Sequence, residues 1–248
     1  MRFYTISVKR LYTVVIALSL AIVLLLFGVV LLPQASVALE DALAASGEAA
    51  LPSKLIILDA GHGGEDCGAI GANGVYEKDL NLAMTMTLGE ELRALGYTVI
   101  YTRTEDRLLY NEEENIKGFR KIYDLRNRCA LAEEYPDALF VSVHMNSFGD
   151  ARYSGLQVYY APDREDSRAF AEHIQQAVVR DVQAENRRSV KSGNDLYLLE
   201  HIENPVVLVE CGFISNVEEC AKLDDVSYRE ALAKAIAQGI VAYDTAEK

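Results

Sequence analysis

The sequence predicts an α/β protein with a mixed, largely parallel sheet that is covered by helices on both faces. Short apolar runs of strand character alternate with segments of helical periodicity, an order typical of βαβ units. The first run, residues 55–58 (LIIL), has no polar interruption, as expected of a strand buried on both faces. A later run, residues 155–160 (GLQVYY), follows its predecessor without an intervening helix, so we expect one antiparallel strand.

The other elements follow from periodicity and from residues that end helices, such as Gly96 and Pro136. The expected strands cover residues 55–58, 97–101, 138–143, 155–160 and 206–209. The expected helices cover residues 79–95, 119–135, 163–182 and 228–243. In the second helix we expect the basic side chains, Arg128 among them, to be available to solvent. The polar, acidic residues 104–118 predict an excursion from the core.

Residues 1–38 differ in composition from the rest of the chain. They contain three basic residues, no acidic residue, and an uncharged run of 22 residues from Leu11 to Leu32. That run is long enough to cross a bilayer as a helix, although residues 36–38 also offer a small-x-small cleavage site for a signal peptide. A buried core helix is the third alternative, but such helices are seldom apolar all round. The basic flank predicts that everything after this segment lies outside the cytoplasm, anchored or secreted.

Residues 39–53 are typical of a linker, because their Ala, Ser, Gly and acidic side chains leave no apolar face to bury. The domain expected over residues 54–248 is long enough for one sizeable core. Without the three positive charges of the leader, the formal net charge changes from −13 to −16. So acidic a domain would repel a phosphate backbone, and we exclude nucleic acid as a partner.

The four cysteines show neither a C-x-x-C pair nor a zinc-finger spacing. Cys129 falls inside an expected helix and Cys211 at an expected strand end, so buried free thiols are the simplest interpretation. An exported protein could form disulfides, but a domain of this size does not need them, and we assign no pairing to these two or to Cys67 and Cys220.

A glycine-rich loop follows the first strand and surrounds His62. Gly61, Gly63 and Gly64 allow a tight turn from which the imidazole projects. In open α/β sheets, ligands bind beyond the carboxyl ends of the strands, which is where this loop lies. The stretch closes at Glu77, and it predicts one half of a metal site, with a plain turn as the alternative.

Two more polar residues come where buried strands are expected to end. His144 follows residues 138–143, and Glu210 follows residues 206–209. Two imidazoles and one carboxylate are a known ligand set for catalytic zinc, with the fourth position left for water. A neighbouring carboxylate that does not bind the metal then acts as general base and acid. The convergence predicts a hydrolytic zinc site.

Each of these residues also has a simpler interpretation. His62 could be a turn residue, His144 a hydrogen-bonded histidine at a strand end, and Glu77 an acidic residue favoured at a helix start. Glu210 is harder to explain, since it lies between VVLV and CGF, where an unpaired carboxylate is costly. The other two histidines end no buried strand, and we assign neither to the metal: His173 and His201.

Five sequence blocks resemble a known family. The chain contains LDAGHGGEDCGAIGANGVYEKDLNLAM, YTRTED, LRNRCALA, FVSVHMNS and NPVVLVECGFISNVEE. Their content and order resemble the zinc-dependent N-acetylmuramoyl-L-alanine amidases of bacterial cell-wall turnover, over nearly all of residues 54–243. The resemblance implies a mixed sheet of about six strands with helices on both faces. It also implies one zinc per chain bound by His62, Glu77 and His144, and Glu210 as the catalytic acid and base.

Two positions depart from the pattern of that family. Cys67 stands where proline is common, which affects the rigidity of the loop, and Met145 replaces the more usual alanine or leucine. The polar segment 104–118, the single apolar segment at the amino terminus and the lack of wall-binding repeats resemble the branch that acts on spore-cortex peptidoglycan.

The hypothesis is therefore a zinc amidase, membrane-anchored or secreted to the cell wall, that cuts the bond between N-acetylmuramic acid and L-alanine in peptidoglycan. One rival is a non-catalytic wall-binding module, which the four intact site residues disfavour. A zinc peptidase acting within the stem peptide stays open, because the ligand set does not exclude it. A cysteine hydrolase using Cys211 is disfavoured, since no histidine is adjacent in sequence.

Overall fold

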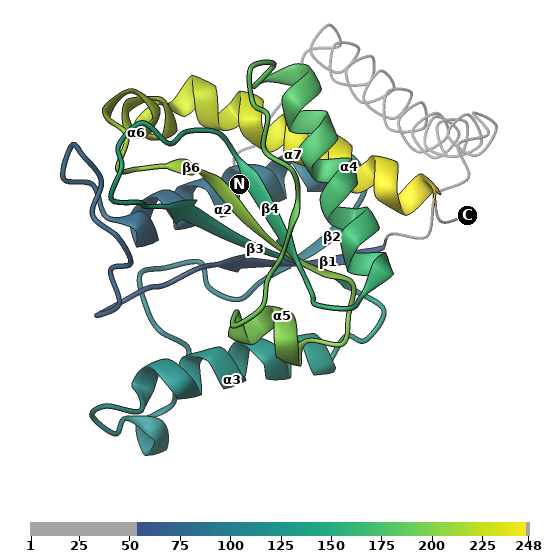
Figure 1. The fold of residues 1–248 in the computed structure, drawn as a ribbon. Coiled ribbons are helices and arrows are strands. Elements are labelled where there is room, and N and C mark those ends of the chain that lie inside the picture. Colours follow the sequence, from purple (N-terminus) through teal and green to yellow (C-terminus); the bar gives the residue numbers. More distant parts are fainter. Residues whose placement is uncertain (1–53, 247–248) are drawn as a thin grey trace, which may run out of the picture. The chain divides into compact units, whose positions relative to one another are not determined.

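A computed structural model describes residues 54–246 of the chain, which form one six-stranded sheet with helices on both faces (Figure 1). The strands lie in the order β2-β1-β3-β6-β4-β5. β4 runs antiparallel to β6, and the other neighbouring strands pair in parallel. The strands are β1 (Leu55–Ala60), β2 (Thr98–Tyr101), β3 (Leu139–Asn146), β4 (Gln157–Tyr160), β5 (Lys191–Ser192) and β6 (Val206–Phe213). The predicted mixed, largely parallel sheet is confirmed, and so is the antiparallel strand within GLQVYY.

Helices α2, α4 and α7 lie on one face of the sheet, and α3 and α5 lie on the other (Figure 1). The helices are α2 (Glu77–Ala94), α3 (Arg120–Glu133), α4 (Glu165–Asp181), α5 (Tyr197–His201), α6 (Val217–Asp224) and α7 (Val226–Ala246), with a short 3₁₀ helix at Glu112–Glu114. Alternate residues of β1 enter different cores. Ile56 and Leu58 belong to the core beneath α2, α4 and α7. Ile57 belongs to the core beneath α3 and α5. Burial on both faces explains the uninterrupted apolar run.

Two strands extend further than the sequence predicted. β3 and β6 continue past His144 and Glu210, and their backbones pair up to Asn146 and Phe213 with a shift in register. The sequence predicts these two polar residues at the ends of their strands. His144 and Glu210 instead lie inside β3 and β6. Their side chains project from one face of the sheet, and this does not interrupt the hydrogen bonding of the backbone.

Four short elements were missed: β5, α5, α6 and the 3₁₀ helix at Glu112–Glu114. β5 has only two residues and α5 only five, too few for periodicity to reveal. α6 begins after Asn216, whose side chain accepts hydrogen bonds from the backbone N–H groups of Glu218 and Glu219. Asn216 and Glu219 are three residues apart, the spacing of a capping box at the start of a helix, so α6 could have been predicted from the sequence.

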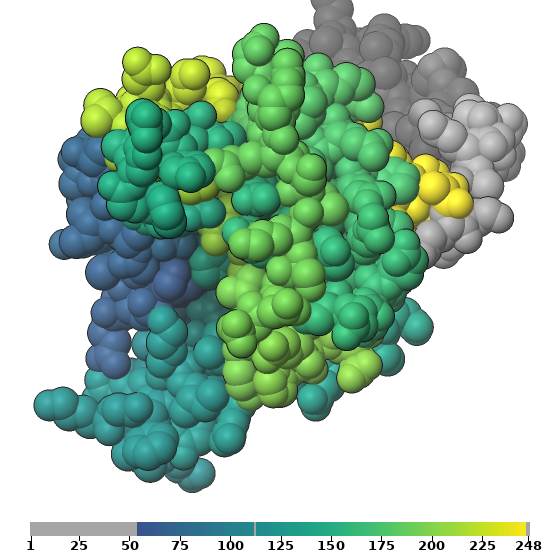
Figure 2. All heavy atoms as spheres, in the orientation of Figure 1, coloured from purple at the N-terminus to yellow at the C-terminus, as the bar shows by residue number. Residues whose placement is uncertain are grey.

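The predicted excursion is present. Residues 104–118 contain no strand, and they stand out from the surface in teal at the lower left of Figure 2. Leu108 is buried, and the backbone N–H of Leu109 donates to Asp124 Oδ1 at 2.7 Å. The excursion is therefore fastened to α3.

No helix within residues 54–246 is long and apolar enough to cross a bilayer. The segment predicted to do so, residues 1–38, and the predicted linker, residues 39–53, lie outside the described residues. The division into leader, linker and domain thus stays a prediction.

Candidate metal centre

The loop after β1 presents His62 from a strained turn. His62 has a φ of 62°, in the left-handed region, and Gly63 and Gly64 on its carboxyl side also have positive φ. Gly61 is needed for space, because a Cβ at this position would lie 2.2 Å from the ring of His144. The predicted tight turn is present, and Gly61 in addition lets the loop pass against a second imidazole.

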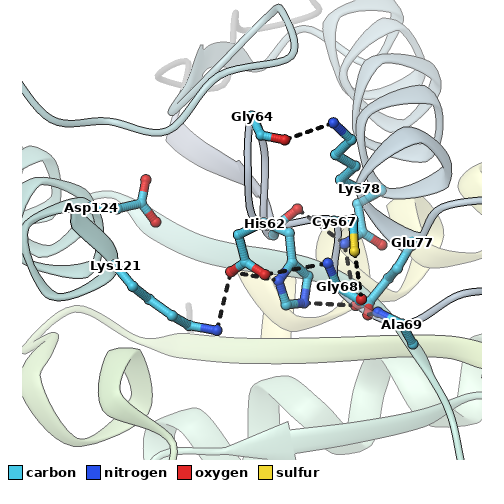
Figure 3. Close-up of polar contacts among 12 residues, drawn as sticks. His62, Gly64, Cys67, Gly68, Ala69, Glu77, Lys78, Lys121 and Asp124 are labelled. Carbon is cyan, nitrogen blue, oxygen red and sulfur yellow. Dashed lines mark hydrogen bonds and ion pairs between the residues drawn. The ribbon is translucent and has the colours of Figure 1, made fainter. Parts of the chain in front are cut away.

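Glu77 is the first residue of α2 and lies between the two imidazoles. Its Oε1 is 3.1 Å from Nε2 of His62 and 3.0 Å from Nδ1 of His144. The two rings meet edge to face, with their centroids 5.0 Å apart. Figure 3 shows His62 and Glu77 pointing toward each other. One ligand atom from each of the three residues lies within 4.8 Å of the others, which is the convergence that a single metal ion requires.

In this cluster, the interactions between Glu77 and the imidazoles favour the ionised carboxylate and the protonated form of His62. Burial raises the pKa of Glu77, but hydrogen bonds and charge from His144 and His62 outweigh burial and hold that pKa well below its usual range. Burial lowers the pKa of His62, but Asp66 and Glu77 outweigh it and raise the pKa to about 9. A carboxylate that binds two imidazoles this closely suits a divalent cation, which would take the place of the shared protons.

Asp66 orients His62. Its Oδ2 lies 3.0 Å from Nδ1 of His62 and also accepts an ion pair from Lys121 at 3.1 Å. With Nδ1 engaged, Nε2 is left to face Glu77. A carboxylate on the distal nitrogen of a metal-binding histidine fixes the tautomer and the ring orientation. The sequence prediction missed Asp66, although it stands four residues after His62 in the same glycine-rich loop.

Glu210 lies beside the cluster rather than in it. It is directly opposite His144 in the pairing of β6 with β3. Its Oε2 is buried and has no hydrogen-bond partner among the described residues. Burial raises the pKa of Glu210 to about 7, since the opposing charges of His144 and His62 only partly offset burial and the charge of Glu77 adds to it. A carboxyl that titrates near neutrality, next to three candidate ligands, has the properties of a general base and acid.

Two buried arginines hold the backbone of the His62 loop from behind. Arg128 Nη2 donates to the carbonyl of His62 at 2.9 Å, and its Nη1 donates to the carbonyl of Ala60 at 2.8 Å. Arg103 donates from Nε to Ala60 and from Nη2 to Gly61, at 2.9 and 3.1 Å. Backbone carbonyls in the loop are thus satisfied by side chains, which fixes a conformation that the chain would not adopt alone.

The prediction that Arg128 faces solvent is wrong. Its side chain is 1% exposed and forms ion pairs with Asp59 and Asp124. Asp59 is fully buried, and it also accepts hydrogen bonds from Thr102 and Ser142. Burial raises the pKa of Asp59, but Arg128 and the two hydroxyls outweigh burial and lower it. The buried guanidinium is therefore compensated by two carboxylates.

The residues left out of the metal site lie elsewhere. His173 and His201 each bond their Nδ1 to a backbone carbonyl one helical turn earlier. Cys211 is fully buried, and burial raises the pKa of its thiol, followed by the charges of Glu210 and Glu219. A thiol of that kind is a poor nucleophile, which further disfavours the cysteine hydrolase. The cysteines are all free: Cys67, Cys129, Cys211 and Cys220.

The carboxyl edge of this α/β sheet brings two imidazoles and a carboxylate together, beside a second carboxyl group with an oxygen that has no hydrogen-bond partner in the described part of the chain. This arrangement is typical of metal-dependent hydrolases. The chain belongs to the N-acetylmuramoyl-L-alanine amidase family, whose model matches residues 56–242. The family named by the sequence resemblance is thereby confirmed.

Individual relatives agree with this assignment. The germination-specific N-acetylmuramoyl-L-alanine amidase of Bacillus subtilis (strain 168) is 34% identical over 197 residues, which cover 79% of this chain and 81% of that protein. An uncharacterized protein of the same organism, YqiI, is 38% identical over 205 residues, covering 81% and 91%. Among solved structures, the CwlD amidase from Clostridioides difficile, in complex with the GerS lipoprotein, matches with a TM-score of 0.75. It is 42% identical, and the match covers 78% of this chain and 99% of that one.

Proposed function

We propose that this protein is a zinc-dependent amidase that hydrolyses the bond between N-acetylmuramic acid and the L-alanine of the stem peptide in peptidoglycan. The observation that supports this most directly is the Oε2 atom of Glu210, which is buried and has no hydrogen-bond partner among residues 54–246. Glu210 is paired with His144 in the sheet. A carboxyl left in that state is costly unless substrate or water completes it. Membership of the amidase family supports the choice of bond.

His62, Glu77 and His144 would hold the zinc. Their ligand atoms converge within 4.8 Å, and two imidazoles with one carboxylate are a set that zinc uses in catalytic sites. When bound there, zinc lowers the pKa of a water molecule to about 7 and polarises the carbonyl of the scissile amide. Asp66 keeps His62 in the orientation that this requires.

Glu210 moves the protons of the reaction. As a carboxylate it accepts a proton from the water whose oxygen bonds to the amide carbon. It then donates that proton to the nitrogen of L-alanine as the C–N bond breaks, so the amine leaves neutral and the carboxyl group stays on muramic acid. A pKa of about 7 suits both steps, because neither protonation state is strongly disfavoured near neutral pH.

The domain organisation and location belong to the same proposal. Residues 1–38 are a signal or membrane segment, residues 39–53 a linker and residues 54–248 the catalytic domain, which acts outside the cytoplasm on the cell wall. The uncharged run from Leu11 to Leu32 supports this. Membrane fractionation of the full chain tests the anchor, and recovery of the intact chain in the cytoplasm would contradict it.

Spore-cortex peptidoglycan is the substrate that we favour within this class. Support comes from the similarity to the germination-specific amidase of Bacillus subtilis and to the CwlD amidase of Clostridioides difficile.

The purified full chain, loaded with zinc, should be incubated with muropeptides, and the products identified by mass spectrometry. We expect a new amine on L-alanine and a free carboxyl on muramic acid. A new amine inside the stem peptide would identify the protein as a peptidase instead. Binding without cleavage would identify it as a wall-binding module.

A further inference from the structure

Arg188 is a cation without a carboxylate partner among residues 54–246, in a strongly acidic protein. Its Nε donates to the carbonyl of Ser154 at 2.7 Å, and its Nη1 donates to Oε1 of Gln157 at 3.3 Å. Arg152 and Arg187, which line the same cavity, are paired with Asp150 and Glu185. Among residues 54–246, Arg188 is thus the arginine of this cavity without an ion pair, although the carboxyl group of Glu219 lies near enough to interact with its charge.

The guanidinium of Arg188 packs against two neighbouring aromatic rings, whose centroids are 6.0 Å apart. Its central carbon lies 4.4 Å from the ring centroid of Phe213 and 5.4 Å from that of Tyr153. The contacts with the two rings and two hydrogen bonds restrain the planar group before any ligand arrives. A fixed guanidinium loses little conformational entropy on binding, so it is suited to recognise an anion.

Arg188 contacts the last of three residues that are paired across neighbouring strands, beginning with His144 of the candidate metal centre. His144 lies directly opposite Glu210, and Glu210 lies directly opposite Gln157 on β4. Residues opposite each other point to the same face, and neighbouring strands are about 4.8 Å apart. Because Gln157 accepts the hydrogen bond from Arg188, the guanidinium lies within roughly 10 Å of Glu210. Beyond it opens the cavity of about 610 Å³ that Arg188 lines.

We propose that Arg188 binds a carboxylate of the stem peptide, on the leaving-amine side of the scissile bond, and so makes the enzyme select substrates that carry this charge. The inference rests on the proposed amidase function. The carboxyl group of muramic acid is consumed in the amide that is cut, so the remaining carboxylates belong to the peptide. An extended residue spans about 3.5 Å, so the residue after L-alanine can present a carboxylate at this distance from Glu210.

Two synthetic muramoyl-L-alanyl peptides test the proposal. In one the second amino acid carries a free carboxylate, and in the other the same group is a carboxamide. The wild-type protein should cleave the carboxylate compound with a kcat/KM about ten- to a hundredfold higher, the usual effect of one charge-assisted pair. Arg188→Met keeps the contact with the two rings, and it should bring the ratio of the two substrates close to one while cleavage of the carboxamide is preserved.

Arg187→Met is the matched control, since this neighbour lines the same cavity but is paired with Glu185, and it should leave the ratio unchanged. Arg188→Lys keeps the charge without the planar fork and should show an intermediate ratio, which provides a second measurement if Arg188→Met unfolds. An unchanged ratio in either Arg188 variant, or an equal loss on both substrates, would overturn the role of Arg188. A wild-type protein that cleaves neither compound would overturn the proposed function and this inference with it.

Discussion

Arg128 of α3 donates a hydrogen bond from Nη2 to the backbone carbonyl of His62 at 2.9 Å. The same guanidinium is paired with Asp59 and Asp124, so a buried ion network and a candidate metal ligand share one side chain. The stability of the domain and the conformation of its site are therefore coupled through this residue.

Replacing Arg128 should destabilise the protein severely. Arg128→Met leaves two buried carboxylates without their counter-charge, and we expect the free energy of unfolding to fall by about 3–5 kcal/mol. Arg126→Met, on the exposed side of the same helix, should change it by less than about 0.5 kcal/mol. Urea unfolding monitored by circular dichroism measures both. Similar small losses in the two variants would show that the network contributes little.

The candidate ligands should determine metal content. The wild-type protein should retain about one zinc per chain after dialysis, as a single site of this ligand set would. His62→Ala and His144→Ala should each abolish tight binding, whereas His173→Ala, on α4, should not. Elemental analysis of the dialysed proteins gives the stoichiometry. One zinc per chain in both ligand variants would rule out this site.

Asp66→Asn should weaken zinc binding without removing a ligand. The amide cannot hold Nδ1 of His62 with the strength of a carboxylate, and loss of such a partner typically lowers metal affinity about 10- to 100-fold. Competition with a chromogenic chelator measures the affinity. Glu65→Gln is the control, because Glu65 is the exposed neighbour and pairs with Arg120 rather than with a histidine. Equal affinities in all three proteins would remove Asp66 from the site.

Glu210→Gln should separate binding of the metal from catalysis. The amide is nearly isosteric and leaves the three candidate ligands untouched, so zinc content and fold should persist. kcat on muropeptides should fall by a factor of about 100 to 10,000, the contribution of general acid–base assistance, with little change in KM. A variant that cleaves at the wild-type rate would refute the role of Glu210, and one that loses zinc would make Glu210 a ligand.

The same residue predicts a pH dependence of stability in the metal-free protein. The pKa of Glu210 is raised from 4.5 to about 7, so between these values the folded state binds more protons than the unfolded state. Stability should therefore fall as the pH rises through this window, by on the order of 3 kcal/mol for this group. In Glu210→Gln, the free energy of unfolding should not show this decrease between pH 4.5 and 7. Urea unfolding with a chelator present, from pH 4.5 to 7.5, gives both curves, and parallel curves would contradict the shift.

The sheet and the position of the site could be predicted because local patterns determine both. Uninterrupted apolar runs identified the buried strands, and His62, His144 and Glu210 followed those runs closely enough to predict their convergence. The burial of Arg128 could not be predicted in this way. Its helix position resembles that of exposed basic neighbours, and the compensating Asp59 is 69 residues away in the sequence. The two-residue strand β5 could not be predicted either, since it is defined only by its pairing with β4 in the folded sheet.

The three candidate ligands come from three different elements: the loop after β1, the first turn of α2 and the middle of β3. An unfolded chain offers them one at a time, separated by long flexible loops, and a single imidazole or carboxylate holds zinc only weakly. Under the proposed function, metal capture would therefore accompany the pairing of β1 with β3. On that proposal, the activity would arise only when these long-range contacts form, so an incompletely folded copy would be unable to cut peptidoglycan.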